Sequence, residues 1–373
     1  MTNLTAIFHA RIAASGPIPF CDFMAAALYD PAHGYYGSGR AAIGRGGDFF
    51  TNVSVGPLFG RLLARQFAEM WVRLGRPGDF TIVEQGAHRG DFARDVLEWL
   101  RANAPECRAA TTYRIVEPVA TLREVQQMAL GDSAVWQARL DELPRFTGVH
   151  FSNELLDAMP VHLVKWAGAE WLERYVAVRD EALVLADGPL SSDALRSAVA
   201  ALPRVPAGYV TEVNLEALAW VDAVAGRLQS GWVLAIDYGH VREEFYAPER
   251  STGTLRAYSG QRLEGDPLAR PGEVDLTAHV EFTSVIERAA RAGLECAGFT
   301  DQHHFMVGLG QLHFRDDAVP EMAELRAYKT LMHPTMMGTS FHALALAKEA
   351  PDAGALAGFK FARPFQMPAP VDR

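Results

Sequence analysis

Cysteine is scarce in this sequence: Cys21, Cys107 and Cys296 are the only three in 373 residues, and they lie far apart. No CxxC pair occurs, so neither a disulfide framework nor a zinc ribbon is indicated, and no metal site is expected. Scattered free cysteines are typical of proteins in a reducing compartment. We therefore expect each cysteine to be a small, packed, apolar side chain.

Positive charge is in deficit. Lys plus Arg number 35 against 45 for Asp plus Glu, which gives a formal net charge of −10. An acidic chain lacks the electrostatic surface of a general nucleic-acid binder, so no nucleic-acid partner is expected. No apolar run approaches the roughly 18 residues of a membrane span, and no basic segment precedes an apolar one as in a secretory signal. We expect no membrane partner and a cytoplasmic location; a homodimer is compatible with the sequence.

Three common catalytic motifs, GxxxxGK[ST], HExxH and GxSxG, are also missing. What is present is an alternation of short β-branched runs with helical patterns. Strands are predicted at residues 80–84, 113–117, 149–153, 232–237 and 341–347, and helices at 57–74, 91–101, 119–130 and 282–294. This alternation predicts an α/β protein with a mostly parallel, doubly wound sheet.

Two interruptions divide the predicted sheet. Residues 161–211 begin with an antiparallel meander, and residues 240–280 are rich in Gly, Pro and charge. We expect three parts: a helical and loop region at 1–75 that closes a ligand pocket, a core at 76–350 that carries both insertions, and a tail at 351–373.

Acidic or amide side chains stand where four of the predicted strands end. They are Glu84, Glu117, Asn153 with Glu154, and Asp237. In an open α/β sheet, ligands bind outside the carboxyl ends of the strands, where the strand order reverses. We therefore expect these side chains to surround one ligand site.

A glycine turn, Glu84-Gln-Gly86-Ala-His88-Arg-Gly90, joins the first predicted strand to a helix. Glycines there let the backbone approach a ligand and expose N–H groups at the helix start, although such a turn is structural at least as often. Glu117 ends the second strand, where an acid can accept both ribose hydroxyls of an adenosine. The alternative for Glu117 is a solvated acid at a strand end.

Eight short motifs in this chain resemble those of the MidA-like family of S-adenosylmethionine-dependent methyltransferases, in the family's order. They span roughly residues 18–347 and are Tyr29-Asp-Pro-Ala-His-Gly-Tyr-Tyr36, Gly47-Asp-Phe-Phe-Thr51, Phe59-Gly60, the 84–90 turn, Asn153-Glu-Leu-Leu-Asp-Ala-Met-Pro160, Ile236-Asp-Tyr-Gly239, Pro271-Gly-Glu-Val-Asp-Leu-Thr-Ala278 and His333-Pro-Thr-Met-Met-Gly338. Mitochondrial members of that family methylate an arginine of a respiratory complex I subunit.

The resemblance implies a class I methyltransferase fold (Rossmann-like), S-adenosylmethionine as cofactor and a protein arginine as acceptor. The residues it places at the cofactor are Asp48, Phe49, Thr51, Glu84, Gly86, His88, Gly90 and Glu117. It places Asn153, Glu154 and Asp157 at the methyl-transfer position, as catalytic residues. The alternative for the two acids is the first turn of a helix, where acids are favoured.

Two departures from the family pattern fall near the expected cofactor site. His88 stands where the family has a glycine, and Val53 and Ser54 replace a proline and a glutamate. One alternative is therefore a binding or assembly protein on the same fold that has lost catalysis. A nicotinamide-dependent enzyme is a third hypothesis, disfavoured because the turn lacks the G-x-G-x-x-G spelling.

Overall fold

The computed structural model describes residues 3–39, 51–259, 262–314, 321–333, 337–351 and 354–362. Its largest sheet has the strand order β15-β16-β10-β5-β2-β3-β4, with the short strand β14 paired to β10. These strands are β2 (Phe80–Gln85), β3 (Thr111–Val116), β4 (Val135–Gln137), β5 (Phe146–Asn153), β10 (Leu228–His240), β14 (Val280–Glu281), β15 (Glu295–Asp301) and β16 (Phe341–Lys348).

The strand directions make this a doubly wound sheet. Strands β2, β3, β4, β5 and β10 run parallel to one another, whereas β16 runs antiparallel to both β10 and β15. The chain moves outward from β2 through β3 to β4 and then returns to β5 on the other side of β2. The strand order therefore reverses between β2 and β5, where a ligand site is expected.

Helices cover both faces, because side chains alternate between the faces along each strand. Ile82 and Phe151 belong to one hydrophobic cluster, and Val83 and Val233 to the other. The first cluster includes side chains from α3 (Leu58–Arg73), α4 (Asp91–Asn103), α5 (Pro105–Ala110), α6 (Ala120–Leu130), α11 (Gln302–His313) and α12 (Met322–Met332). The second includes α8 (Leu215–Arg227) and α10 (Phe282–Arg291).

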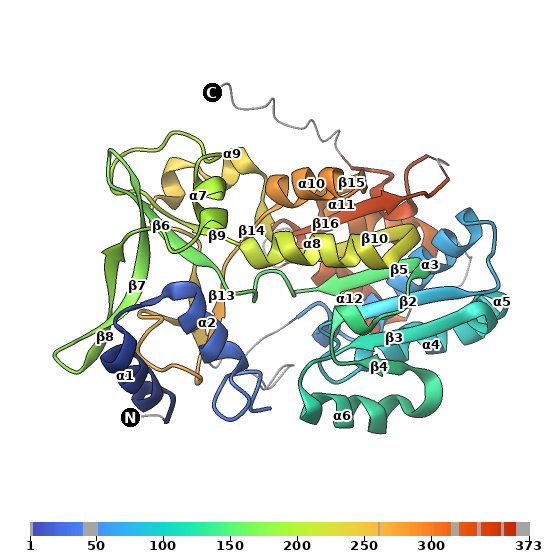
Figure 1. The fold of residues 1–373 in the computed structure, drawn as a ribbon. Helices are drawn as coiled ribbons and strands as arrows, with labels where there is room; N and C mark the ends of the chain where they lie inside the picture. Colours follow the sequence, from blue (N-terminus) through green and yellow to red (C-terminus); the bar gives the residue numbers. More distant parts are fainter. Residues whose placement is uncertain are drawn as a thin grey trace.

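A second, antiparallel sheet lies beside the central one, at the left of Figure 1. It consists of β1 (Ile18–Pro19), β6 (His162–Trp166), β7 (Trp171–Arg179), β8 (Ala182–Gly188) and β9 (Val210–Val213), with α7 (Asp193–Val199) before β9. Strand β1 pairs with β7. Helices α1 (Asn3–Ser15) and α2 (Phe20–Tyr29) share a hydrophobic cluster with this sheet and with residues of the second insertion. The start of the chain is thus packed on the inserted segments.

The second insertion contains α9 (Arg242–Phe245) and a small sheet of β11 (Arg256–Ser259), β12 (Arg262–Glu264) and β13 (Asp275–Thr277). The remaining short elements are the 3₁₀ turns η1 (Val53–Val55), η2 (Gly131–Ser133), η3 (Leu140–Glu142), η4 (Pro248–Arg250) and η6 (Ala357–Phe359).

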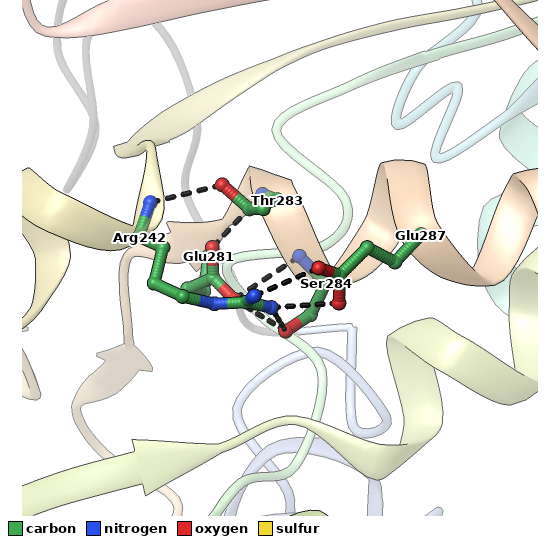
Figure 2. Close-up of polar contacts among 5 residues, drawn as sticks. All are labelled: Arg242, Glu281, Thr283, Ser284 and Glu287. Carbon is green, nitrogen blue, oxygen red and sulfur yellow. Dashed lines mark hydrogen bonds and ion pairs between the residues drawn. The ribbon is translucent and has the colours of Figure 1, made fainter. Parts of the chain in front are cut away.

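Both ends of this insertion are fastened at the start of α10 (Figure 2). Arg242 donates to the two carboxylate oxygens of Glu287, at 2.7 Å each. Glu281 caps the helix by accepting from the backbone N–H groups of Thr283 and Ser284, at 2.9 and 3.0 Å. Since Arg242 also lies 3.5 Å from Glu281, the insertion starts and finishes at the carboxyl end of β10. That is the edge of the sheet where ligands bind.

Candidate functional site

A cavity of about 1580 Å³ lies at the carboxyl ends of β2, β3, β5 and β10. Gln85, Glu117, Asn153 and Tyr238 line it from these four strand ends. Ligand cavities usually measure about 300–1,000 Å³, so this one has room for a cofactor together with part of a second ligand. The predicted ligand site is therefore present as a cavity at the point where the strand order reverses.

The glycine turn borders this cavity in a left-handed conformation. Gly86 and Gly90 have φ of +83° and +82°, and His88 between them has +46°. A side chain at positive φ is unfavourable, although histidine tolerates it better than a β-branched residue does. The carbonyl oxygen of His88 accepts a hydrogen bond from Gln126 of α6 at 2.8 Å. Histidine thus adopts the conformation for which glycine is favoured, and the cavity persists beside it.

Glu84 and Glu117, the two acids expected at the cofactor, both line the cavity and are both buried. Glu84 accepts a hydrogen bond from the hydroxyl of Tyr113 at 2.7 Å, and burial raises its pKa to about 8. Glu117 accepts from the N–H of Val119 at 2.9 Å and from the amide of Gln126 at 3.1 Å. Each carboxylate oxygen has two acceptor positions, so Glu117 can still accept from two ribose hydroxyls.

Glu154 is the end of a chain of side-chain hydrogen bonds. The amide of Gln302 donates to Asn52 Oδ1 at 2.8 Å, Asn52 donates to Asn153 Oδ1 at 2.9 Å, and Asn153 donates to Glu154 Oε1 at 2.8 Å. Glu154 has a positive φ of +52°, a strained conformation that persists only when neighbours hold it in place. Burial, and then repulsion from Asp157, raise its pKa to about 8.

Asp157 and Asp237 form a buried pair next to Glu154. Asp237 Oδ2 accepts from the backbone N–H groups of Leu155 and Leu156, at 3.1 and 2.8 Å. Asp157 lines the cavity, and its Oδ1 has no hydrogen-bond donor in the described part of the chain. Burial raises the pKa of Asp157 to about 6, and burial with repulsion from Asp157 raises that of Asp237. Residues 154–160 form turns, so the acids do not begin a helix.

Eight of the eleven predicted site residues line this one cavity, whereas Gly90 is not among the lining residues. Thr51 lines it from the N-terminal side and exchanges a hydrogen bond with Ser54 at 2.9 Å. Asp48 and Phe49 lie outside the described residues.

Two polar residues behind the cavity were missed from the sequence, the fully buried Asn52 and Gln302. Asn52 directly follows a family motif, which is the only local signal. Gln302 has none, because it lies 250 positions further along the chain.

The fold and the site together define a class I methyltransferase. The strand order reverses beside a glycine turn, an acid follows the second strand, and the last strand is antiparallel. Residues 62–300 match the family model described as S-adenosyl-L-methionine-dependent methyltransferase, so the chain belongs to this family. The resemblance to the MidA-like family, the fold class and the cofactor are thereby confirmed.

Curated relatives cover most of the chain. The protein arginine methyltransferase NDUFAF7 homolog, mitochondrial, of Drosophila melanogaster is 30% identical over 92% of this chain and 84% of its own. The mouse protein arginine methyltransferase NDUFAF7, mitochondrial, is 28% identical over 90% of this chain and 82% of its own. Because these relatives are named as mitochondrial proteins, the expected cytoplasmic location is wrong.

A solved structure similar to this chain contains the demethylated cofactor. It is a superfamily member from Burkholderia thailandensis bound to S-adenosyl-homocysteine, 32% identical, with a TM-score of 0.84 over 96% of this chain and 95% of that one. A second crystal structure from the same organism is 34% identical, with a TM-score of 0.83 over 96% and 94%. The nicotinamide hypothesis has no support from these matches.

In the described ranges, none of the helices combines the length and apolar character that crossing a bilayer requires. The expectations about membranes, nucleic acids and a homodimer remain predictions.

Proposed function

We propose that this protein transfers a methyl group from S-adenosylmethionine to an arginine side chain of a protein substrate. Two independent lines support the proposal: the names of the curated relatives, which are protein arginine methyltransferases, and the chemistry of the cavity. The cavity carries the stronger argument because it concerns this chain's own residues.

The observation that carries the proposal is a group of carboxyl side chains at the ends of β5 and β10. Glu154, Asp157 and Asp237 all have raised pKa values, and burial is the first cause for each. No lysine or arginine of the described groups is among the main causes of these three shifts. Buried carboxylates are unfavourable unless they are paired with a positive charge. A guanidinium that arrives in the cavity would supply that charge.

The residues present fit the cofactor. Gly86 has no side chain beside the cavity, and the nearest atom that an added Cβ would contact is Leu155 Cδ1, at 3.5 Å. Glu117 keeps acceptor positions for the hydroxyls of a ribose. When bound, the cofactor supplies a methyl group activated by a sulfonium. In such transfers the protein acts mainly by positioning, which can lower the barrier by up to about 7–11 kcal/mol.

The chain's own residues then have separate tasks. Glu154 would bind the guanidinium, orient one nitrogen and accept a proton from it. A pKa of about 8 suits a base near neutral pH. Asp157 would accept from a second guanidinium N–H through its unpartnered Oδ1. Asn153, held by Asn52, fixes the carboxylate of Glu154.

The test is methyl transfer to a defined product. Purified protein is incubated with tritiated S-adenosylmethionine and a substrate extract, and the hydrolysed proteins are analysed for labelled methylarginine and methyl-lysine. We expect label in methylarginine, strongly reduced for Glu154→Gln and unchanged for the exposed Asp132→Asn. Label in lysine would refute the proposed acceptor.

The non-catalytic alternative is tested in parallel by calorimetric titration with S-adenosyl-homocysteine. We expect binding by the wild type. Binding without transfer to any residue would favour a binding or assembly protein, and no binding to the wild type but recovered binding to His88→Gly would identify His88 as the obstacle.

A further inference from the structure

Part of the cavity lining near Glu154 and Asp157 comes from outside the central sheet. Tyr29, at the end of α2, and Tyr36, in the loop that follows, line it from the N-terminal segment. Asp275, the first residue of β13, lines it from the second insertion and is only 2% exposed. We call these three residues the insertion wall. Two of the eight family motifs meet there, and neither has a part in the roles described above.

The insertion wall is joined to the segment that carries the catalytic acids. The hydroxyl of Tyr29 donates to the carbonyl oxygen of Ala158 at 2.9 Å. The N–H of Ala278, which follows β13 directly, donates to the carbonyl oxygen of Asp157, also at 2.9 Å. Because both bonds end on adjacent residues of one turn, the spacing between the insertion wall and Asp157 is fixed by the backbone.

The side chains of the insertion wall combine aromatic surface with negative charge. The rings of Tyr29 and Tyr36 stack with centroids 5.8 Å apart and 23° between their planes. The Tyr36 side chain hydrogen-bonds to Asp275. Burial, followed by the negative charges of Asp275 and Asp157, raises the pKa of Tyr29. The charge of Asp275 also raises the pKa of Glu154. The carboxylates of Asp275, Asp157 and Glu154 therefore act on the same part of the cavity, which Arg250 and Arg256 also line.

A planar guanidinium carries five N–H donors around its edge, whereas an ammonium is a compact point charge with three. Acceptors from two different segments match the first shape, because donors on different edges of the plane can be satisfied together. Aromatic faces favour a guanidinium over a neutral group of the same size. The unpartnered Oδ1 of Asp157, on a side chain that is only 6% exposed, is a further acceptor in the same cavity.

We propose that the insertion wall is the second half of an arginine-binding subsite, in which Asp275 accepts from the guanidinium edge opposite Glu154 and Tyr36 positions Asp275. This inference rests on the proposed function and adds that the acceptor subsite is built jointly by the N-terminal segment and the second insertion. The central sheet alone would bind the cofactor but would hold an arginine on one edge only.

The experiment measures binding, so that it does not depend on an identified protein substrate. The probes are N-acetyl-arginine amide and its neutral isostere N-acetyl-citrulline amide, each titrated into protein saturated with S-adenosyl-homocysteine and followed by NMR. For the wild type we expect the arginine probe to bind at least about tenfold more tightly than the citrulline probe.

Asp275→Asn should reduce this arginine preference by about tenfold or more, because it removes one charged acceptor. Tyr36→Phe keeps the ring but removes the phenol bond to Asp275, so it should reduce the preference by a smaller factor. Asp132→Asn should leave it unchanged. Affinity for S-adenosyl-homocysteine should stay within about threefold of the wild type in all three variants, which also verifies that they are folded.

The outcomes separate the two hypotheses. If the wild type prefers arginine and both insertion-wall variants keep the full preference, the insertion wall is not part of the subsite, while the proposed function stands. Equal loss of affinity for the arginine and citrulline probes would indicate a merely structural role and would also overturn the inference. A wild type with no preference for arginine, and no methylarginine in the transfer assay, would instead remove the proposed function itself.

Discussion

The pH dependence of methyl transfer follows from the surroundings of Glu154. Its carboxyl must be ionised to accept a proton from the acceptor, and burial with repulsion from Asp157 raises its pKa to about 8. With that pKa, about one-eleventh of the free protein carries the ionised form at pH 7 and about ten-elevenths at pH 9. We therefore expect kcat/KM to increase about tenfold between these pH values and then to level off.

The two kinetic constants should respond differently, because they report different states. The profile of kcat/KM reports groups of the free enzyme, and that of kcat reports groups of the complex with substrate. A bound guanidinium stabilises the ionised carboxylate, so the midpoint for kcat should lie below that for kcat/KM. Buffers of constant ionic strength are needed, because salt screens the charges.

Glu154→Gln is the decisive variant. A glutamine side chain can keep the hydrogen bonds from Asn153 and the N–H of Asn52 but cannot accept a proton. We expect a rate reduced by about 10²–10⁴-fold and a profile without the step near pH 8. A wild-type profile that is flat from pH 6 to 9, or a step that survives in Glu154→Gln, would refute the assignment of Glu154 as the base.

Three further changes test the supports of the site. Glu84→Gln removes a carboxyl whose pKa is raised to about 8. The contribution of this carboxyl to stability is complete below pH about 4.5 and is lost as the pH rises through about 8, so the free energy of unfolding in urea should rise for the variant relative to the wild type by on the order of a few kcal/mol between pH 5 and 9. Parallel plots of unfolding free energy against pH for the two proteins would contradict this. His88→Gly relieves the strain of a positive φ but makes the unfolded chain more flexible, so the stability should change by less than about 1 kcal/mol. His88→Val should lose more stability, because a β-branched residue is less favourable at positive φ. Equal melting temperatures for the two variants would be inconsistent with strain at this position. Asn52→Leu interrupts the chain of amides behind Glu154 and should cost about 1–3 kcal/mol in denaturant unfolding, which a shift below 0.5 kcal/mol would rule out.

The sequence was sufficient for five of the eight strands of the central sheet and for the strand-end acids, and the physical reason is local. The predicted strands β2, β3, β5, β10 and β16 contain short β-branched or apolar runs bounded by turn residues, so the runs themselves indicate strands. Strands β4, β14 and β15 were not predicted, because they are two or three residues long or, like Glu295–Asp301, lack such a run. The parallel direction of the strands then brings Glu117, Asn153 and Asp237 to one edge without any further information.

The choice of helix or turn after Asn153 could not be made locally. An acid followed by leucines is compatible with a first helical turn, and only the long-range bonds from the N–H groups of Leu155 and Leu156 to Asp237 decide for a turn. Contacts between distant segments were equally inaccessible. Cys107 is buried as expected, whereas Cys296 is exposed, contrary to the expectation. Cys21 has its Sγ within 4.8 Å of the side-chain atoms of His162 and Glu173 that could bind a metal ion. Burial and the neighbouring acids raise the pKa of this thiol to about 12, so it stays protonated.

The raised pKa values also explain how one cavity can serve two cationic ligands. The sulfonium of the cofactor and the guanidinium of an arginine repel each other, and a cavity without negative charge would bind them in competition. Glu84 begins the glycine turn, and Glu154 lies near enough to Asp275 of the insertion wall for the charge of Asp275 to raise its pKa. Since Glu84 and Glu154 hold protons at neutral pH when no cation is near, each arriving cation should release a proton and ionise the carboxyl beside it. The carboxyls would thereby compensate the charge of each ligand as it binds, and the repulsion between the two ligands would be reduced by the same groups that align them.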